Sequence, residues 1–212
     1  MQQIEDLKPG VPVILADGLF PESQRVLEFL HQASTIICCD GATVKLLEHE
    51  LQPDYIVGDM DSLPEQFKRR FESIISSSAD QLTNDLTKAV NKALELGLGK
   101  VVILGATGLR EDHTMGNIGL LAEHGQKLQL QMVSDYGIFN PVYETTIFGS
   151  FKAQQVSIFS VMGNPAITLH DLKYSLNDYV LKNLWEGTLN EALETSFRIE
   201  FTDGALVVFR AF

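Results

Sequence analysis

Short apolar runs alternate with segments of helical spacing through roughly the first 135 residues of the chain. The apolar runs, which predict buried strands, are residues 11–16, 35–39, 54–58, 73–77, 100–105 and 128–133. The segments that place apolar side chains on one helical face are residues 23–32, 43–50, 84–97 and 114–125. Strand–helix alternation of this kind favours right-handed crossovers and a mostly parallel sheet between layers of helices. We therefore expect a three-layer α/β domain over residues 1–136.

The pattern changes in the last third of the chain, where no segment has good helical spacing and short β-rich pieces follow one another. These pieces are residues 143–149, 154–161, 166–174, 195–201 and 205–212. The Asp203-Gly204 pair between the last two pieces is a strong signal for a tight hairpin. A domain of about 75 residues is small for a stable core of its own. We predict an all-β sandwich over residues 137–212 that packs on the first domain or on a second copy of itself.

Acidic residues follow the apolar runs of the first domain. They are Asp40, Asp59, Asp61, Asp85 and Asp112. Because ligands of parallel α/β sheets bind beyond the carboxyl ends of the strands, we expect these carboxylates to gather at that edge. Crowded carboxylates repel one another unless cations bind between them. The sequence therefore predicts a Mg²⁺-dependent site for a polyphosphate.

The sharpest of these motifs is Gly-Asp-Met-Asp-Ser at 58–62. Alternate residues of an extended chain point to the same side, roughly 6–7 Å apart, so Asp59 and Asp61 would reach one metal ion or two adjacent ones. Gly58 would let the backbone approach a phosphate closely. The alternative interpretation is an Asx-type turn that contains two aspartates.

A helix start offers groups for a phosphate tail. Asn84 or Thr83 can cap the helix, whose first-turn amide groups then form an anion site. Asp85 and Lys88 are three residues apart and share a helical face. The same pattern also describes an ordinary capped helix with a surface ion pair. Gln81, just before the cap, is either a nucleotide contact or a plain loop residue.

The loop after the run at 100–105 carries a second group of candidates. Gly105 and Gly108 make it tight and adaptable, and Arg110 is a candidate phosphate clamp because a guanidinium group matches phosphate oxygens. Asp112 is a candidate metal ligand or proton acceptor. His113 is either a general base or a helix-capping residue. The glycine spacing fits neither a Walker A loop nor the GxGxxG dinucleotide fingerprint.

Asp40 and Gly41 end another predicted strand, where a ribose contact, a metal contact and a plain turn all fit.

The chain has 212 residues and a formal net charge of −12, with no Lys/Arg cluster long enough to follow a nucleic-acid backbone. This argues against a nucleic-acid partner but not against a nucleotide, because metal ions supply positive charge locally.

Other features of the sequence indicate the cellular compartment of the protein. The polar, acidic start of the chain is unlike a secretory signal, and the apolar run at 101–109 is too short to span a bilayer. Cys38 and Cys39 are the only cysteines, and as neighbours they offer no disulfide framework. We expect a reduced, cytoplasmic setting and no membrane partner.

A set of motifs keeps one order along the chain: DGA at 40–42, PDYIVGDMDS at 53–62, QLTNDLTKA at 81–89, LGATGLREDHTMGNI at 104–118, LKYSL at 172–176 and GTLNE at 187–191. In combination these motifs resemble those of the thiamine pyrophosphokinase family, over nearly the whole chain. The resemblance implies an α/β domain followed by a β-sandwich, and a homodimer whose active sites are shared between subunits. It also implies transfer of the pyrophosphoryl group of ATP to the hydroxyl of thiamine, with Mg²⁺, and release of AMP.

The resemblance also assigns residues. It implies that the Mg²⁺ ligands and the groups that set up attack are Asp59, Asp61, Asp85 and Asp112, with Arg110 on the transferring group. It implies ATP contacts from Asp40, Gly41, Gln81, Asn84, Lys88, Gly105 and Arg110. Tyr174 is expected to stack on the thiamine pyrimidine ring, and Asn190 to lie near the thiamine site.

The chain departs from the family pattern in places. DGATV at 40–44 lacks the usual DGGAN ending, and Asn84 stands where Thr is common. Tyr174 stands where the family usually has Trp, and Leu189 replaces the Ser of a Ser-Asn pair. The last two departures fall on the acceptor side and leave the metal chemistry intact.

Two other classes of protein compete with this interpretation. An Asp-x-Asp metal-dependent phosphatase also places two aspartates after a strand, but here Gly58 precedes the pair and Ser62-Leu63 follow it. A non-catalytic nucleotide or thiamine sensor would keep every acid and alter the acceptor pocket. Thiamine-dependent AMP release, free phosphate release or no turnover distinguishes the three.

Overall fold

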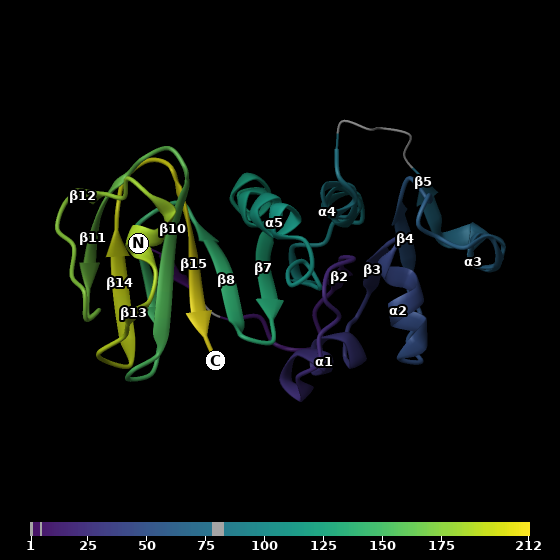
Figure 1. Ribbon diagram of the computed structural model, residues 1–212, viewed down its shortest axis with the longest axis horizontal. Coiled ribbons are helices and arrows are strands. Elements are labelled where there is room, and N and C mark those ends of the chain that lie inside the picture. The colour runs from purple at the N-terminus through teal and green to yellow at the C-terminus, as the bar shows by residue number, and fades with distance from the viewer. Residues whose placement is uncertain (1, 5, 78–82) are drawn as a thin grey trace. The chain divides into compact units, whose positions relative to one another are not determined.

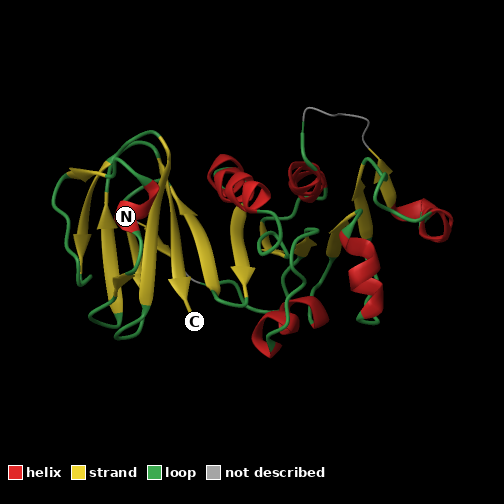
Figure 2. Cartoon of the chain, in the orientation of Figure 1, coloured by secondary structure: helices red, strands yellow, loops and turns green. Residues whose placement is uncertain are grey.

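The computed structural model describes residues 2–4, 6–77 and 83–212, and the chain divides into two compact units. One unit, here called the α/β unit, comprises Leu7–Leu120 and Lys127–Asp135. The other, here called the β unit, comprises Met1–Asp6, Leu121–Gln126 and Tyr136–Phe212. Figure 1 traces both along the chain, and Figure 2 shows the helices concentrated in the first and the strands dominating the second.

The α/β unit is built on a parallel sheet, as predicted. Its strands are β2 (Val13–Leu15), β3 (Ile36–Cys39), β4 (Tyr55–Gly58), β5 (Ile75–Ser77), β6 (Lys100–Leu104) and β7 (Gln129–Ser134). They lie in the order β7-β6-β2-β3-β4-β5, and every adjacent pair is parallel. The central strands are continuous apolar runs because both of their faces are covered; all three residues of β2 are fully buried.

Helices connect the successive strands of this sheet. They are α1 (Gln24–His31), α2 (Ala42–Glu48), α3 (Glu65–Arg70), α4 (Asp85–Glu95) and α5 (Glu111–His124), with a 3-10 turn at Glu72–Ile74. Figure 1 shows α4 on one side of the sheet and α1 and α2 on the other. The short α3 was not predicted because it buries no residue and so has no apolar stripe. Helix α5 begins at Glu111 rather than at 114, so Asp112 and His113 lie in its first turn.

The β unit is a sandwich, as predicted. One sheet has the order β1-β9-β14-β11-β12, and the other contains β13-β10-β15-β8. The first sheet comprises β1 (Gln2–Ile4), β9 (Thr146–Gly149), β11 (Ala166–His170), β12 (Tyr179–Val180) and β14 (Ser196–Glu200). The second comprises β8 (Gly137–Val142), β10 (Gln155–Met162), β13 (Asn190–Glu191) and β15 (Ala205–Ala211). One apolar core takes residues from both sheets, among them Phe148, Ile158, Phe197 and Val208.

Several strand predictions in this unit were wrong or incomplete. The turn at Asp203-Gly204 does not close a hairpin, because β14 pairs with β9 and β11 while β15 pairs with β8 and β10 in the other sheet. The strand expected over 166–174 ends at His170, since Asp171 has a left-handed backbone (φ 61°). Strand β1 was missed because two of its three residues are polar, and it pairs in parallel with β9.

Strand β8 was also missed. Pro141 lies within it, and proline weakens any strand prediction because it has no amide hydrogen to donate.

Among the described residues, no helix has the length and apolar character needed to cross a membrane.

Candidate active site

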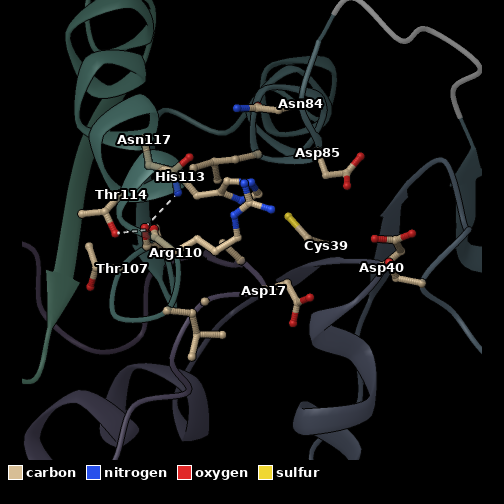
Figure 3. A pocket seen from close by; sticks show the side chains of 16 residues that line it. Asp17, Cys39, Asp40, Asn84, Asp85, Thr107, Arg110, His113, Thr114 and Asn117 are labelled. Atoms are coloured by element: carbon tan, nitrogen blue, oxygen red, sulfur yellow. Dashed lines mark hydrogen bonds between the residues drawn. The ribbon is translucent and has the colours of Figure 1, made fainter.

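A cavity of about 390 Å³, here called the α/β cavity, opens at the carboxyl ends of the parallel strands. Its walls come from the loops after β2, β3, β4 and β6 and from the starts of α4 and α5, the position where ligands of such sheets bind. Figure 3 shows Asp17, Asp40 and Asp85 on one side and Thr107, Thr114 and Asn117 on the other. The lining residues are Ala16, Asp17, Gly18, Cys39, Asp40, Ser62, Asn84, Asp85, Leu86, Ala106, Thr107, Leu109, Arg110, His113, Thr114 and Asn117.

Three carboxylates meet beside this cavity. Asp40, Asp59 and Asp61 each offer an oxygen, and these oxygens lie within 4.8 Å of one another. Asp40 is only 3% exposed, and burial, together with the charges of Asp85 and Asp59, raises the pKa of its carboxyl. Its Oδ1 accepts a hydrogen bond from the amide of Gly41 (2.7 Å), whereas its buried Oδ2 has no hydrogen-bond partner in the described part of the chain. A buried carboxylate oxygen left in this state fits a hard cation such as Mg²⁺, which prefers oxygen ligands.

The loop that brings Asp59 and Asp61 together is a turn rather than the extended segment that we expected. Met60 has a left-handed backbone (φ 68°), and the amide of Asp61 donates to Asp59 Oδ1 at 3.1 Å. This hydrogen bond lowers the pKa of Asp59, so its carboxylate stays charged. Ser62 Oγ donates to Asp61 Oδ1 at 3.0 Å. The Asx-type turn and the metal-binding interpretation are therefore compatible in one loop.

Gly58 has a role that the sequence did not reveal. A Cβ atom at Gly58 would lie 2.7 Å from Cγ of Asp40 and 3.0 Å from its Oδ1. Atoms cannot approach so closely, so a side chain at position 58 would displace the Asp40 carboxylate. Gly58 therefore leaves room for an acid from the neighbouring strand, in addition to any approach by a ligand.

The start of α4 has the expected cap. Asn84 Oδ1 accepts a hydrogen bond from the amide of Thr87 at 2.8 Å, and Asp85 pairs with the buried Lys88 at 3.1 Å. Asn84 and Asp85 line the α/β cavity, while Lys88 is not among the described residues that do. Gln81, the remaining candidate in this motif, lies outside the described residues.

Arg110 and Asp112 form a pair. Arg110 Nε and Nη2 donate to the two carboxylate oxygens of Asp112 at 3.0 and 2.6 Å, and both side chains are exposed. These hydrogen bonds lower the pKa of Asp112 to about 2. The two candidates expected to hold phosphate and metal are therefore hydrogen-bonded to each other. Arg110 lines the cavity together with His113.

The expected set of four metal-binding acids is not the set that meets. Asp59 and Asp61 are joined by Asp40, which the sequence left open between metal, ribose and turn. Asp85 and Asp112 do not belong to this group and are each paired with a basic residue. The structure brings Asp40, Asp59 and Asp61 together, whereas the prediction from strand ends took no account of the basic residues that pair with Asp85 and Asp112.

Sequence reasoning missed Asp17, which lies just after β2 and lines the cavity. Lys45 Nζ donates to Asp17 Oδ1 at 2.6 Å and to the Gly18 carbonyl at 3.0 Å. A Cβ at Gly41 would collide with the Asp17 carboxylate, so Gly41 shapes the cavity without lining it. The signal was available, because Asp17-Gly18 repeats the strand-end pattern of Asp40-Gly41.

Gly105 also acts through the backbone. It adopts a left-handed conformation (φ 65°), and its carbonyl accepts a hydrogen bond from the amide of Gly18 at 2.6 Å. This contact joins the loops after β2 and β6. Asn117 Nδ2 donates to the Ala106 carbonyl at 2.8 Å and fixes the second of these loops from α5.

The β unit has a cavity of its own of about 290 Å³, here called the β cavity. It is lined by Ile158, Ile167, Leu169, Tyr174, Leu176, Trp185, Glu186, Gly187, Thr188 and Asn190. Two of these residues, Tyr174 and Asn190, are the ones for which the family resemblance implied an acceptor role. Trp185 and Glu186 were missed, because no motif pattern marks them.

The Asn190 side chain is hydrogen-bonded to the backbone of Tyr174. Its Oδ1 accepts hydrogen bonds from the amides of Tyr174 (3.0 Å) and Glu191 (2.9 Å), and its Nδ2 donates to the Tyr174 carbonyl at 2.8 Å. Asn190 is buried, whereas the Tyr174 side chain is 60% exposed. The geometry makes Asn190 a residue that fixes the backbone beneath an exposed aromatic ring.

Comparison with known proteins places the chain. It matches the family model described as "Thiamin pyrophosphokinase, catalytic domain" over residues 26–133 and that described as "Thiamin pyrophosphokinase, substrate-binding domain" over residues 137–209. The chain belongs to the thiamine pyrophosphokinase family. It is therefore an enzyme of the transferase class, and the resemblance found in its motifs is confirmed. Much of the α/β cavity lies in the first matched region and the whole β cavity in the second.

Individual members of the thiamine pyrophosphokinase family agree. The chain is 29% identical over 181 residues to thiamine pyrophosphokinase of Bacillus subtilis, covering 81% of this chain and 85% of that protein. A crystal structure of the Bacillus subtilis protein superposes with a TM-score of 0.75 at 25% identity and covers 95% of this chain and 98% of that one. The crystal structure of the yeast protein, at 13% identity, has a TM-score of 0.79, covers 100% of this chain and 91% of that one, and supports the fold alone.

Proposed function

We propose that the protein transfers the pyrophosphoryl group of ATP to the hydroxyl of thiamine, giving thiamine diphosphate and AMP. The observation that carries this proposal is the meeting of Asp40, Asp59 and Asp61 within 4.8 Å, beside a cavity at the carboxyl ends of parallel strands. Family membership supports the same reaction.

We further propose that Asp40, Asp59 and Asp61 hold Mg²⁺. The chemistry of this set fits the ion, because all three offer carboxylate oxygens and one buried oxygen of Asp40 has no other described partner. When bound, the ion would offset charge on the phosphate oxygens of ATP. Asp85 lies close enough to raise the pKa of Asp40 and is a candidate for a further ligand.

Protein groups then hold the triphosphate. Helix α4 begins at the cavity wall, which Asn84 and Asp85 line, and the partial positive charge of its N-terminus would attract phosphate. Arg110 exchanges its carboxylate partner for phosphate oxygens, since a guanidinium fork matches both. That exchange frees Asp112, whose low pKa reflects the pairing and rises once Arg110 leaves. Asp112 or Asp85 then orients the acceptor hydroxyl or takes its proton. Positioning dominates, because phosphoryl transfer needs little covalent help from the protein.

For the acceptor, we propose that Tyr174 stacks on the thiamine pyrimidine ring and that Asn190 keeps Tyr174 in place. We also propose a cytoplasmic homodimer with shared active sites and no nucleic-acid or membrane partner. The motif resemblance supports the dimer. Light scattering on the purified protein tests it, with a monomer mass at catalytic concentrations as the contrary result.

The experiment that tests the function measures AMP and free phosphate released from ATP and Mg²⁺, with and without thiamine. We expect AMP release that depends on thiamine, accompanied by thiamine diphosphate. Free phosphate without AMP would identify a phosphatase instead. Binding of both ligands without turnover would identify a sensor.

A further inference from the structure

The only tryptophan of the chain lies exposed at the β cavity. Trp185 is 70% exposed, although large aromatic side chains usually bury most of their surface. Its backbone, by contrast, is held firmly in a 3-10 turn at Leu184–Gly187. The Trp185 carbonyl accepts hydrogen bonds from the amide of Thr188 (3.1 Å) and from its hydroxyl (2.7 Å). An exposed indole on a fixed turn is a surface that a ligand can cover at little cost in ordering.

Gly187 fixes that turn against the sheet. A Cβ at this position would collide with the carbonyl oxygen of Ile158 on β10 and would lie 3.2 Å from Leu181 Cδ1. The turn therefore lies as close to β10 as a backbone can. This contact sets where Trp185 and its neighbour stand at the cavity wall.

That neighbour is Glu186, and its carboxylate is held by neutral donors. It accepts hydrogen bonds from the amide of Lys182 (2.8 Å), from Asn183 Nδ2 (2.9 Å) and from the Tyr179 hydroxyl (3.4 Å). The Asn183 side chain and the Lys182 amide lower the pKa of Glu186, so the group is ionised near neutral pH. Because all three donors are uncharged, the carboxylate keeps its negative charge.

The rest of the cavity suits a flat, mostly apolar ligand. Ile158, Ile167 and Leu169 supply aliphatic walls, and Tyr174 supplies a second exposed ring. The ammonium group of Lys173 already lies 5.9 Å from the centre of the Tyr174 ring. A second cation is therefore less favoured at Tyr174 than at Trp185 and Glu186.

We propose that Trp185 and Glu186 determine specificity for the acceptor by binding a planar heteroaromatic cation, such as the thiazolium ring of thiamine. Indole is the aromatic ring that attracts cations best, and an adjacent carboxylate adds direct charge attraction. The uncharged pyrimidine ring of the acceptor would then stack on Tyr174. The inference rests on the proposed function and goes beyond it, because it names the groups that distinguish a cationic acceptor from a neutral one.

The test compares two ligands on the full-length protein: thiamine and thiamine thiazolone, in which the charged thiazolium is replaced by a neutral thiazolone ring. Because Trp185 is the only tryptophan, its fluorescence reports binding at this site directly. For Glu186→Gln we expect the Kd for thiamine to rise about tenfold and that for thiamine thiazolone to change less than about twofold. Glu194→Gln removes the same charge from an exposed position outside the cavity and should change neither value.

Equal changes for both ligands in Glu186→Gln, or none, would overturn the inference, as would unaltered Trp185 fluorescence when either ligand saturates the wild-type protein. Thiamine-dependent AMP release by the wild type is measured separately. If the wild type turns over thiamine but Glu186→Gln changes the Kd for thiamine and for thiamine thiazolone equally, only the role of Trp185 and Glu186 is rejected. Charge-dependent binding without AMP release rejects only the proposed reaction.

Discussion

The α/β cavity and the β cavity place their polar groups in opposite ways. In the α/β cavity, acids stand at strand ends, and glycines at positions 41 and 58 leave space for them. In the β cavity, the exposed lining residues are aromatic. The backbone of one of them, Tyr174, is hydrogen-bonded to the buried side chain of Asn190. The first arrangement suits charge, which needs fixed partners and metal ions, and the second suits a flat ring, which needs area. Changes in the α/β cavity should therefore reduce kcat, and changes in the β cavity should raise KM for the acceptor.

The largest effect is expected for Asp61→Asn. The change removes one of three grouped carboxylates while Asp61 itself is exposed, so the fold should survive. A metal ion contributes several kcal/mol to stabilising transition-state charge, so we expect kcat to fall about a thousandfold or more. Calorimetry should also show that Mg²⁺-linked ATP binding is lost. Asp203→Asn is the matched control, because that exposed aspartate lies far from this group in the sequence and asparagine tolerates its left-handed backbone. Normal turnover in Asp61→Asn would remove the metal-binding role.

Gly58→Ala tests whether space for Asp40 matters. A methyl group 2.7 Å from Asp40 Cγ must displace the carboxylate, so we expect kcat to fall about a hundredfold with an apparent Mg²⁺ requirement shifted to higher concentration. Stability should fall by about 1–3 kcal/mol, as in other overpacked sites. Gly99→Ala is the control, because a Cβ there meets nothing within 4 Å. If the two variants show the same kinetics, Gly58 is dispensable for the acid cluster.

Asn190→Ala moves the comparison to the β cavity. The change leaves the amide and carbonyl of Tyr174 without their side-chain partner and should cost about 1–3 kcal/mol of stability. We expect KM for thiamine to rise about tenfold, equivalent to about 1.4 kcal/mol, while kcat at saturating thiamine stays near the wild-type value. If Asn190 had a purely structural role, the variant would show a lower apparent kcat, because less protein is folded, and an unchanged KM. That result would contradict the proposal that Asn190 positions Tyr174.

What the sequence revealed differs between the two cavities for a physical reason. In the α/β cavity, each acid lies close in sequence to a glycine and to the end of an apolar run. The sequence alone therefore identifies Asp40, Asp59 and Asp61 as candidates. It does not identify their partners, because the contact of Gly58 with Asp40 joins two strands and depends on register. The β cavity was predicted only in part, since Tyr174 and Asn190 came from a family resemblance. Trp185 and Glu186 carry no periodic signal, and their position depends on a turn packed against β10.

The fold follows the same division. The central strands β2, β3 and β6 of the parallel sheet were predicted because their buried residues form continuous apolar runs. Strands β1 and β8 were not, because β1 is polar and β8 contains Pro141. The Asp203-Gly204 turn was recognised as a turn, but local sequence does not say whether the two flanking strands share a sheet. Two apolar runs joined by a tight turn fit either a hairpin or a crossing between the layers of a sandwich.

The smallest effect concerns the pairing of Arg110 and Asp112, which the proposed mechanism requires to be exchangeable. Arg110→Met removes the main cause of the low pKa of Asp112, so carboxyl NMR should show this pKa rising from about 2 toward the ordinary value of 3.8. It should stop short of that value, because the amide of His113 still donates to Asp112 Oδ1 at 2.9 Å. Since the pKa is depressed in the folded state, the pair favours folding above about pH 4 and loses this contribution as the pH falls toward 2. The stability difference between variant and wild type should therefore shrink in acid. Asp59 is an internal control, because its pKa is lowered mainly by the Asp61 amide and should not move. An unchanged pKa of Asp112 would mean that Arg110 is not its partner in solution, and Arg110 would then be free to hold phosphate without any exchange.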